Sequence, residues 1–178
     1  MFNPPPRLNG HTFRNQKKEN KKFAMSSSAF EDGGNIPVRF CKEEVEGGEN
    51  ISLPVSWSNI PEETQSLFLV LFDPHPVAQD FIHWVVADIP TSISGLQEGA
   101  SGENMPASGK ELINGYGDIG YGGPQPPAGT GPHPYTLILF ALNSQELDLP
   151  NQPSWAGINL KLAPIIITSV KMVGYYGR

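Results

Sequence analysis

Cysteine is almost absent from this chain, since Cys41 is the only one among 178 residues. No disulfide can form within the chain, which favours a reducing compartment, and zinc sites built on several thiolates are excluded. Long apolar runs are also missing, and none approaches the ~20 residues that a membrane-spanning helix requires. We therefore expect a cytoplasmic protein without an integral membrane segment.

Basic residues are scarce outside the first 25 positions. Residues 1–25 hold six lysines and arginines and one acidic residue, which leaves six basic and 17 acidic residues in the remainder, a formal charge of −11 there. Because an acidic body repels the phosphates of nucleic acids, no nucleic-acid partner is expected. Any anion that this protein binds must be held by local hydrogen-bond donors.

The first 22 residues lack the apolar segment of a secretory signal. They are basic, as organelle transit segments are, but they contain no serine and include three consecutive prolines. The pattern predicts a flexible basic extension over 1–22, with organelle targeting left open. The length of the remainder suits one domain, which we place at 23–178.

Glycine and proline are abundant, with 19 and 18 residues, which favours turns over long helices. Between the turns, alternating or continuous apolar residues indicate β-strands. The expected strands cover 23–27, 36–40, 53–57, 66–72, 81–89, 135–142 and 165–173. The segment 66–72 is nearly continuous apolar sequence, which predicts a strand buried on both faces.

A single short helix is predicted around 152–163, ended by Pro164. These strands and the single helix predict a mainly β fold class, with a β-sandwich-like architecture and a short peripheral helix. Between Ile89 and Tyr135 lies a long Gly/Pro-rich loop without a predicted element. Eleven glycines occur from Gly95 to Gly131. Loops of this length are uncommon in compact domains and often functional, and glycine lets the backbone approach a ligand closely.

Three polar residues fall at strand ends, namely Asp73, His83 and His133. Histidines can donate N–H bonds to an anion, while a carboxylate fixes the imidazole tautomer or raises the imidazole pKa. Nearby glycine amides would complete an anion-binding cradle. The residues predict a pocket for a phosphate or carboxylate. The alternative is that each histidine is a hydrogen-bonded structural residue.

Other chemistries have weaker support. His75 could complete a two-histidine, one-carboxylate metal set, but no recognised metal spacing is present, and no metal or cofactor is predicted. Residues 115–120 match G-x-G-x-x-G without the strand and helix that the dinucleotide motif needs. Glu111 follows Gly109-Lys110, which excludes a P-loop. Without a G-x-S-x-G elbow, and with Cys41 interpreted as structural, no catalytic residue and no enzyme are predicted.

Longer motifs point to a known family. Residues 73–75 (Asp-Pro-His), 81–86 (Phe-Ile-His-Trp-Val-Val) and 122–135 (Gly-Gly-Pro-Gln-Pro-Pro-Ala-Gly-Thr-Gly-Pro-His-Pro-Tyr) resemble the phosphatidylethanolamine-binding protein family, also called the Raf kinase inhibitor protein family. Residues 27–37 and 174–178 resemble its bacterial-type branch in particular. The resemblance covers about residues 22–178.

The resemblance implies a β-sandwich with a shallow pocket for phosphate, phosphorylated head groups such as phosphoethanolamine, or similar anions. Carried over residue by residue, it places ligand-binding positions at Asp73, His83, His133 and Tyr135, with Trp84, Gly120, Pro124 and Gly131 shaping the wall. It also implies a protein that modulates or inhibits a partner, such as a kinase or a serine protease. No established catalytic activity accompanies the family.

One residue departs from the family pattern. The family usually has Asp-Pro-Asp-Ala-Pro where this chain has Asp73-Pro74-His75-Pro76-Val77. If His75 faces the pocket, the site loses a negative charge and gains a donor, and anion affinity rises below pH ~6.5. If His75 faces solvent, the change has no effect on binding.

The leading hypothesis is therefore an anion-binding protein that modulates a protein partner. One alternative is an enzyme that uses Asp73 with His83 or His133 as an acid–base pair on a phosphoester. Another is a purely protein-facing inhibitor whose pocket is vestigial. The sequence leaves open the physiological ligand, the protein partner and the oligomeric state.

Overall fold

The computed structural model describes residues 21–178, so nearly all of the predicted N-terminal extension lies outside the described residues. Two antiparallel sheets make up the domain. The larger has the order β6-β4-β3-β7-β8 and the smaller β1-β2-β5. The strands are β1 (Ala24–Ser26), β2 (Val55–Ser58), β3 (Ser66–Asp73), β4 (Phe81–Ile89), β5 (Gly95–Leu96), β6 (Lys110–Glu111), β7 (His133–Leu142) and β8 (Ile166–Tyr176).

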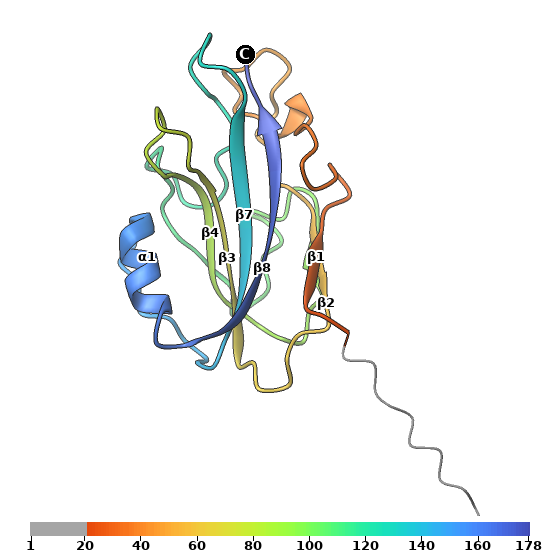
Figure 1. The fold of residues 1–178 in the computed structure, drawn as a ribbon, viewed down its shortest axis with the longest axis vertical. Helices are drawn as coiled ribbons and strands as arrows, with labels where there is room; N and C mark the ends of the chain where they lie inside the picture. Colours follow the sequence, from red (N-terminus) through yellow and green to blue (C-terminus); the bar gives the residue numbers. More distant parts are fainter. Residues whose placement is uncertain (1–20) are drawn as a thin grey trace, which may run out of the picture.

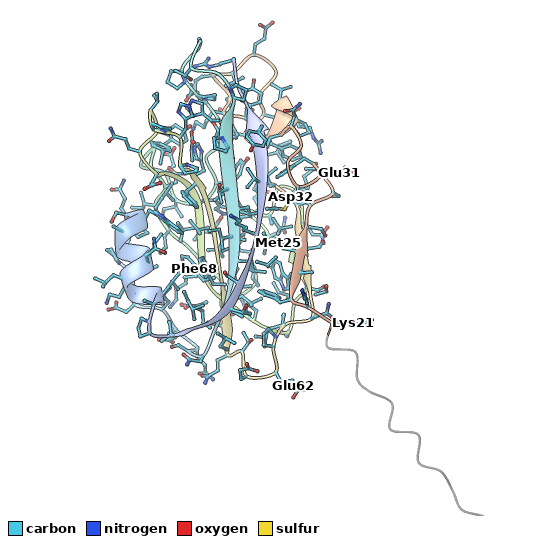
Figure 2. The ribbon with its side chains drawn as sticks, in the orientation of Figure 1. Lys21, Met25, Glu31, Asp32, Glu62 and Phe68 are labelled. Atoms are coloured by element: carbon cyan, nitrogen blue, oxygen red, sulfur yellow. The ribbon has the colours of Figure 1, made fainter. Side chains whose placement is uncertain are left out.

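The domain is layered around the larger sheet. The helix α1 (Trp155–Leu162) lies against one face of this sheet, and the smaller sheet lies on the other face (Figure 1). Figure 2 shows side chains filling both spaces, with Phe68 on the helix side and Met25 on the side of the smaller sheet. The predicted mainly β, sandwich-like fold with a peripheral helix is confirmed.

The central strand β3 explains how one sheet supports two cores. Successive side chains of a strand point to opposite faces. Leu67, Leu69 and Leu71 accordingly pack between the two sheets, whereas Phe68 and Val70 pack under α1. Every residue of β3 is buried. The nearly continuous apolar run of this segment is therefore the signature of a strand covered on both faces, as predicted.

The predicted helix forms, but it is shorter than 152–163. Ser154 caps it, because its side-chain oxygen accepts a hydrogen bond from the Gly157 amide at 3.1 Å. Ile158 and Leu162 are its fully buried residues and anchor it to the sheet. The helix ends at Leu162, immediately before Ala163 and Pro164. No helix within residues 21–178 has the length and apolarity needed to cross a membrane.

The predicted strand at 36–40 is wrong. A 3₁₀ turn, η1 (Val38–Phe40), occupies most of this segment. The amides of Phe40 and Cys41 donate to the carbonyls three residues earlier, at 3.0 and 2.8 Å, and these local bonds replace a strand ladder. Pairing with β8 is limited to the beginning of the segment: Asn35, just before it, forms an isolated bridge with Tyr175, and the Ile36 amide donates to the Tyr175 carbonyl at 2.8 Å.

The long loop between β4 and β7 is held by one carboxylate. Glu111 accepts hydrogen bonds from Trp84 Nε1 at 2.7 Å, from the Ser101 hydroxyl at 2.6 Å and from the Gly102 amide at 2.7 Å. These bonds tie residues near 101 to β6 and to the core. The loop, which also contains the short strands β5 and β6, is therefore ordered by these side-chain hydrogen bonds together with backbone turn hydrogen bonds.

Candidate functional site

Sheet topology brings the predicted site residues together. In an antiparallel sheet the end of one strand lies beside the start of its neighbours. Asp73 ends β3, and it pairs with Phe81 at the start of β4. On the other side of β3, Phe72 pairs with Thr136 near the start of β7. The site thus forms at the end of the larger sheet where β8 leads to the C-terminus (Figure 1).

Asp73 and His133 form a buried pair at this end. The Oδ2 atom of Asp73 lies 2.5 Å from Nδ1 of His133, and the His133 side chain is fully buried. Oδ1 accepts a hydrogen bond from the His75 amide at 2.9 Å. On the opposite edge of the imidazole, Nε2 lies 2.8 Å from the Thr130 hydroxyl. Both ring nitrogens of His133 therefore have protein partners, which fixes the ring in place.

His83 is held by the long loop. Its Nδ1 atom donates a hydrogen bond to the Gly122 carbonyl at 2.7 Å. Burial, which disfavours the charged imidazolium, lowers the pKa of His83 to about 4 against the opposing effects of the Gly122 carbonyl and Asp73. The ring is therefore neutral at pH 7, with its proton on Nδ1 and a lone pair on Nε2.

Aromatic rings build the wall around His83. The Tyr135 ring lies 5.0 Å from the His83 ring and the Phe81 ring lies at the same distance, measured between centroids. Tyr116 packs edge-on against Phe81 at 4.7 Å. Burial raises the pKa of both tyrosines, and the charge of Asp73 raises it further. Both phenols therefore stay protonated, and the Tyr116 hydroxyl donates to the Gly123 carbonyl at 3.1 Å.

These residues enclose a small open cavity of about 220 Å³. Four of the predicted site residues line it, namely Asp73, His83, His133 and Tyr135. Sequence reasoning missed several further lining residues, namely Val77, Ala78, Phe81, Tyr116, Gln125, Pro126 and Pro127. Tyr116 lies within the G-x-G-x-x-G string at 115–120, and the proline pair lies within the family-like motif. Both signals were present in the sequence, but only the fold shows that they belong to the pocket.

The four predicted wall residues do not line this cavity. Trp84 is fully buried between the sheets, where its indole N–H is bonded to Glu111. Gly120 packs against Ser101 and Glu111, and a Cβ there would approach the Ser101 hydroxyl to 2.5 Å. Pro124 contributes its carbonyl to the Lys42 amide, and Gly131 lies against Gly177. Their positions support the loop that carries the pocket.

His75 covers the pair instead of lining the cavity. Its ring stacks on that of His133, with centroids 3.8 Å apart and 18° between the planes. Its Nδ1 accepts a hydrogen bond from the Val77 amide at 3.3 Å, which turns the ring onto His133. The side chain thus forms a half-buried lid over one face of His133.

The cavity contains a carboxylate but no lysine or arginine. Two cations contact residues of its lining. Lys42 Nζ lies 4.8 Å from the centre of the Tyr116 ring, and Arg178 Nε donates to the Pro126 carbonyl at 2.6 Å. Within residues 21–178 no three histidine, cysteine, aspartate or glutamate side chains gather as metal ligands would. Recognition in this cavity therefore depends on hydrogen bonds and on shape, without a lysine or arginine among the lining residues.

The fold and the site together define a two-sheet β-sandwich protein with a small polar pocket at the end of its larger sheet. The sequence model of the phosphatidylethanolamine-binding protein family matches residues 26–177. The chain belongs to this family, as its motifs predicted.

Relatives agree with this assignment. A UPF0098 protein of Aquifex aeolicus is 36% identical over 152 residues, covering 85% of this chain and 86% of the relative. The crystal structure of Escherichia coli YbcL, described as a member of the mammalian PEBP family, superposes with a TM-score of 0.82 at 26% identity and covers 89% of this chain and 99% of YbcL. A homologue from Chlamydia trachomatis superposes with a TM-score of 0.73 at 28% identity, covering 88% of this chain and 97% of that one.

Proposed function

We propose that the pocket binds phosphate or a phosphorylated head group, such as phosphoethanolamine or that of a phospholipid, and that the protein modulates a protein partner without catalysis. The observation that carries the proposal is the buried Asp73–His133 pair beside His83 and Tyr135 at one cavity. A carboxylate and two imidazoles kept largely from solvent are costly to bury unless paired. Their convergence at one cavity favours a binding role.

The test is a titration of the full chain with inorganic phosphate, followed by NMR on the imidazoles of His83 and His133. Saturable shifts on both rings support the pocket. Asp73→Asn keeps the side-chain volume but replaces the carboxylate that holds His133 and accepts from a ligand donor, so we expect at least tenfold weaker phosphate binding. Asp80→Asn is the matched control, because Asp80 is an exposed carboxylate with a left-handed backbone that asparagine tolerates. Binding that survives Asp73→Asn unchanged would refute the site.

The partner is proposed to be a kinase or a serine protease in the cytoplasm. Inhibition of such an enzyme by the wild-type chain and by Asp73→Asn separates two readings. If both chains inhibit equally, the protein acts through another surface and the pocket is vestigial for that purpose. If only the wild type inhibits, the pocket takes part in recognition.

An enzymatic alternative has one observation in its favour, which is the chain of hydrogen bonds from Asp73 through His133 to the Thr130 hydroxyl. The Thr130 hydroxyl, however, donates to the Pro127 carbonyl at 2.7 Å. Its oxygen is then placed to accept from Nε2–H of His133, and the ring has no free nitrogen to take the proton of Thr130. Cys41 is no better a nucleophile, because burial raises the pKa of its thiol to about 12. Turnover of a generic phosphoester, lost in Thr130→Ala, would favour the enzyme.

A further inference from the structure

The hydrogen-bond polarity of the pocket restricts what it can hold. The single N–H of neutral His83 already donates a hydrogen bond to the Gly122 carbonyl, at 2.7 Å. A neutral imidazole carries one N–H and one lone pair, so the ring that lines the cavity offers an acceptor at Nε2. The Asp73 carboxylate, which also lines the cavity, is acceptor-only when ionised. Two of the four central groups therefore require a donor from the ligand.

The other two central groups differ in what they offer. Both nitrogens of His133 already have partners, in Asp73 and Thr130. The Tyr135 hydroxyl lines the cavity, and its raised pKa keeps it protonated. It is therefore the phenol placed to donate to a ligand oxygen, whereas the hydroxyl of Tyr116 is bonded to Gly123. A ligand must then both accept from Tyr135 and donate to His83.

Charge leads to the same restriction. The titratable groups facing His83 are Asp73 from β3, His133 and Tyr135 from β7, and Tyr116 from the long loop. Among the lining residues there is no lysine or arginine to offset a second negative charge on the ligand. A dianion would also leave the Nε2 lone pair of His83 without a donor, because it carries no proton on its phosphoryl oxygens. A monoanion that keeps one proton avoids both the extra charge and the unmatched acceptor.

We propose that the pocket selects a phosphoryl group that keeps one proton, with its P–OH donating to Nε2 of His83 and an unprotonated oxygen accepting from the Tyr135 hydroxyl. This inference rests on the proposed function, since it specifies which form of the phosphoryl ligand is bound. It makes phosphate monoesters the preferred class and excludes sulfates, which have the oxygens but lack the proton. Affinity then follows the protonation of the ligand.

The test compares methyl phosphate with methyl sulfate on the full chain by calorimetry between pH 5 and pH 7.5. Singly protonated methyl phosphate and methyl sulfate carry the same charge and differ at the proton. Because the second pKa of a phosphate monoester is ~6, its monoanion falls about 30-fold over this interval. We expect the methyl phosphate affinity to fall by the same factor, and methyl sulfate to bind weakly at every pH.

Protein protonation would produce a different pattern. If a histidine of the protein were responsible, methyl sulfate would gain affinity at low pH in parallel, and that result would overturn the inference. A difluoromethylphosphonate, whose second proton is more acidic, must shift the midpoint to lower pH, and an unshifted midpoint would equally contradict it. All of these comparisons use the wild-type chain and change only the ligand, so misfolding of a variant cannot affect the result.

Intact phospholipid head groups are diesters and have no phosphoryl proton. Glycerophosphoethanolamine has ammonium N–H donors but no P–OH. Its binding therefore shows whether the donor to His83 is the phosphoryl proton or the ammonium group. Weaker binding than methyl phosphate at pH 5 supports the phosphoryl proton. Equal binding without pH dependence assigns the donor to the ammonium group and refutes the inference, while the proposed function stands. Failure of all these ligands to bind would remove the proposed function as well.

Discussion

The imidazole of His75 lies flat on that of His133, with ring centroids 3.8 Å apart. This contact occurs at the position where the family usually has a second aspartate. A ring here covers the buried Asp73–His133 pair, whereas a carboxylate would bring a like charge close to Asp73. The substitution therefore replaces a repulsive neighbour with a stacking one.

Restoring the family residue tests this role. We expect His75→Asp to weaken phosphate binding roughly fivefold, because a second carboxylate at the rim costs about 1 kcal/mol of Coulomb repulsion against an anion. His75→Phe keeps the stacked ring and should leave the affinity within about twofold. Calorimetric titration at pH 7.5 measures both. Equal losses in the two variants would show that the imidazole itself, and not the ring stack, matters.

His83 should make the fold acid-sensitive. The pKa of an unfolded histidine is ~6.5, and burial lowers that of His83 to about 4. The unfolded chain therefore binds this proton more tightly than the folded protein does. The stability contributed by the neutral ring is complete above pH ~6.5 and is lost as the pH falls toward 4. At about 1.4 kcal/mol per pKa unit, the loss is on the order of a few kcal/mol.

Urea unfolding at pH 7.5, 5.5 and 4.5 measures this loss. His83→Asn retains a donor for the Gly122 carbonyl but has no titrating ring, so its stability should depend less on pH over this interval. His75→Phe is the control, because it replaces a half-buried histidine and leaves His83 in place, so the pH dependence that His83 causes should remain. Identical slopes for wild type and His83→Asn would contradict the neutral, buried state of the ring.

Glu111 should be essential for ordering the long loop. Glu111→Ala removes the acceptor of three hydrogen bonds, from Trp84, Ser101 and Gly102. It also leaves the buried indole N–H without a partner. We expect a loss of about 3 kcal/mol in the free energy of unfolding, since bonds to charged groups contribute ~1.5–3 kcal/mol each and are not additive.

The matched control for this carboxylate is Glu103→Ala, because Glu103 is exposed on the same loop and its removal should cost under ~0.5 kcal/mol. Hydrogen exchange adds a local measurement. Faster exchange at the Gly102 amide in Glu111→Ala, with the exchange of β3 unchanged, locates the effect. Equal stability of the two variants would show that the loop is held by other contacts.

Gly123 lies where the pocket loop crosses the backbone near Phe40. A Cβ at this position would approach the Phe40 carbonyl oxygen to 2.2 Å, so Gly123→Ala forces backbone to move. We expect it to destabilise the fold by about 2 kcal/mol or more and to weaken phosphate binding, because Gly122 and Gly123 hold His83 and Tyr116.

Gly117→Ala is the comparison for Gly123→Ala, since a Cβ at Gly117 meets open space and only its positive φ of 94° carries a cost. That cost is about 1 kcal/mol. Thermal or urea unfolding ranks the two variants, and the phosphate titration checks the site. If the Gly123→Ala protein were as stable as Gly117→Ala, the backbone around Gly123 would be able to move away from Phe40 without a measurable cost, which contradicts the prediction.

Much of the fold was predictable from local patterns. The apolar run of β3 required a strand covered on both faces, and it has one core on each side. The helix began at a serine cap and ended before Pro164. The prediction of a strand at 36–40 was wrong because the alternating residues of this segment resemble a strand, whereas local hydrogen bonds after Pro37 close a 3₁₀ turn. Such bonds compete with sheet pairing and leave no periodic signal in the sequence.

The sequence by itself determined the family and the sandwich, because long motifs and strand patterns are local, and the family resemblance implied that Asp73, His83, His133 and Tyr135 share a pocket. Only the tertiary structure decided how these groups are bonded. The carbonyl of Gly122, 39 residues from His83, sets the tautomer of that ring. Asp73 and His133 meet across 60 residues. Hydrogen-bond polarity depends on which distant backbone atom reaches a ring nitrogen, and such contacts exist only once the chain has folded.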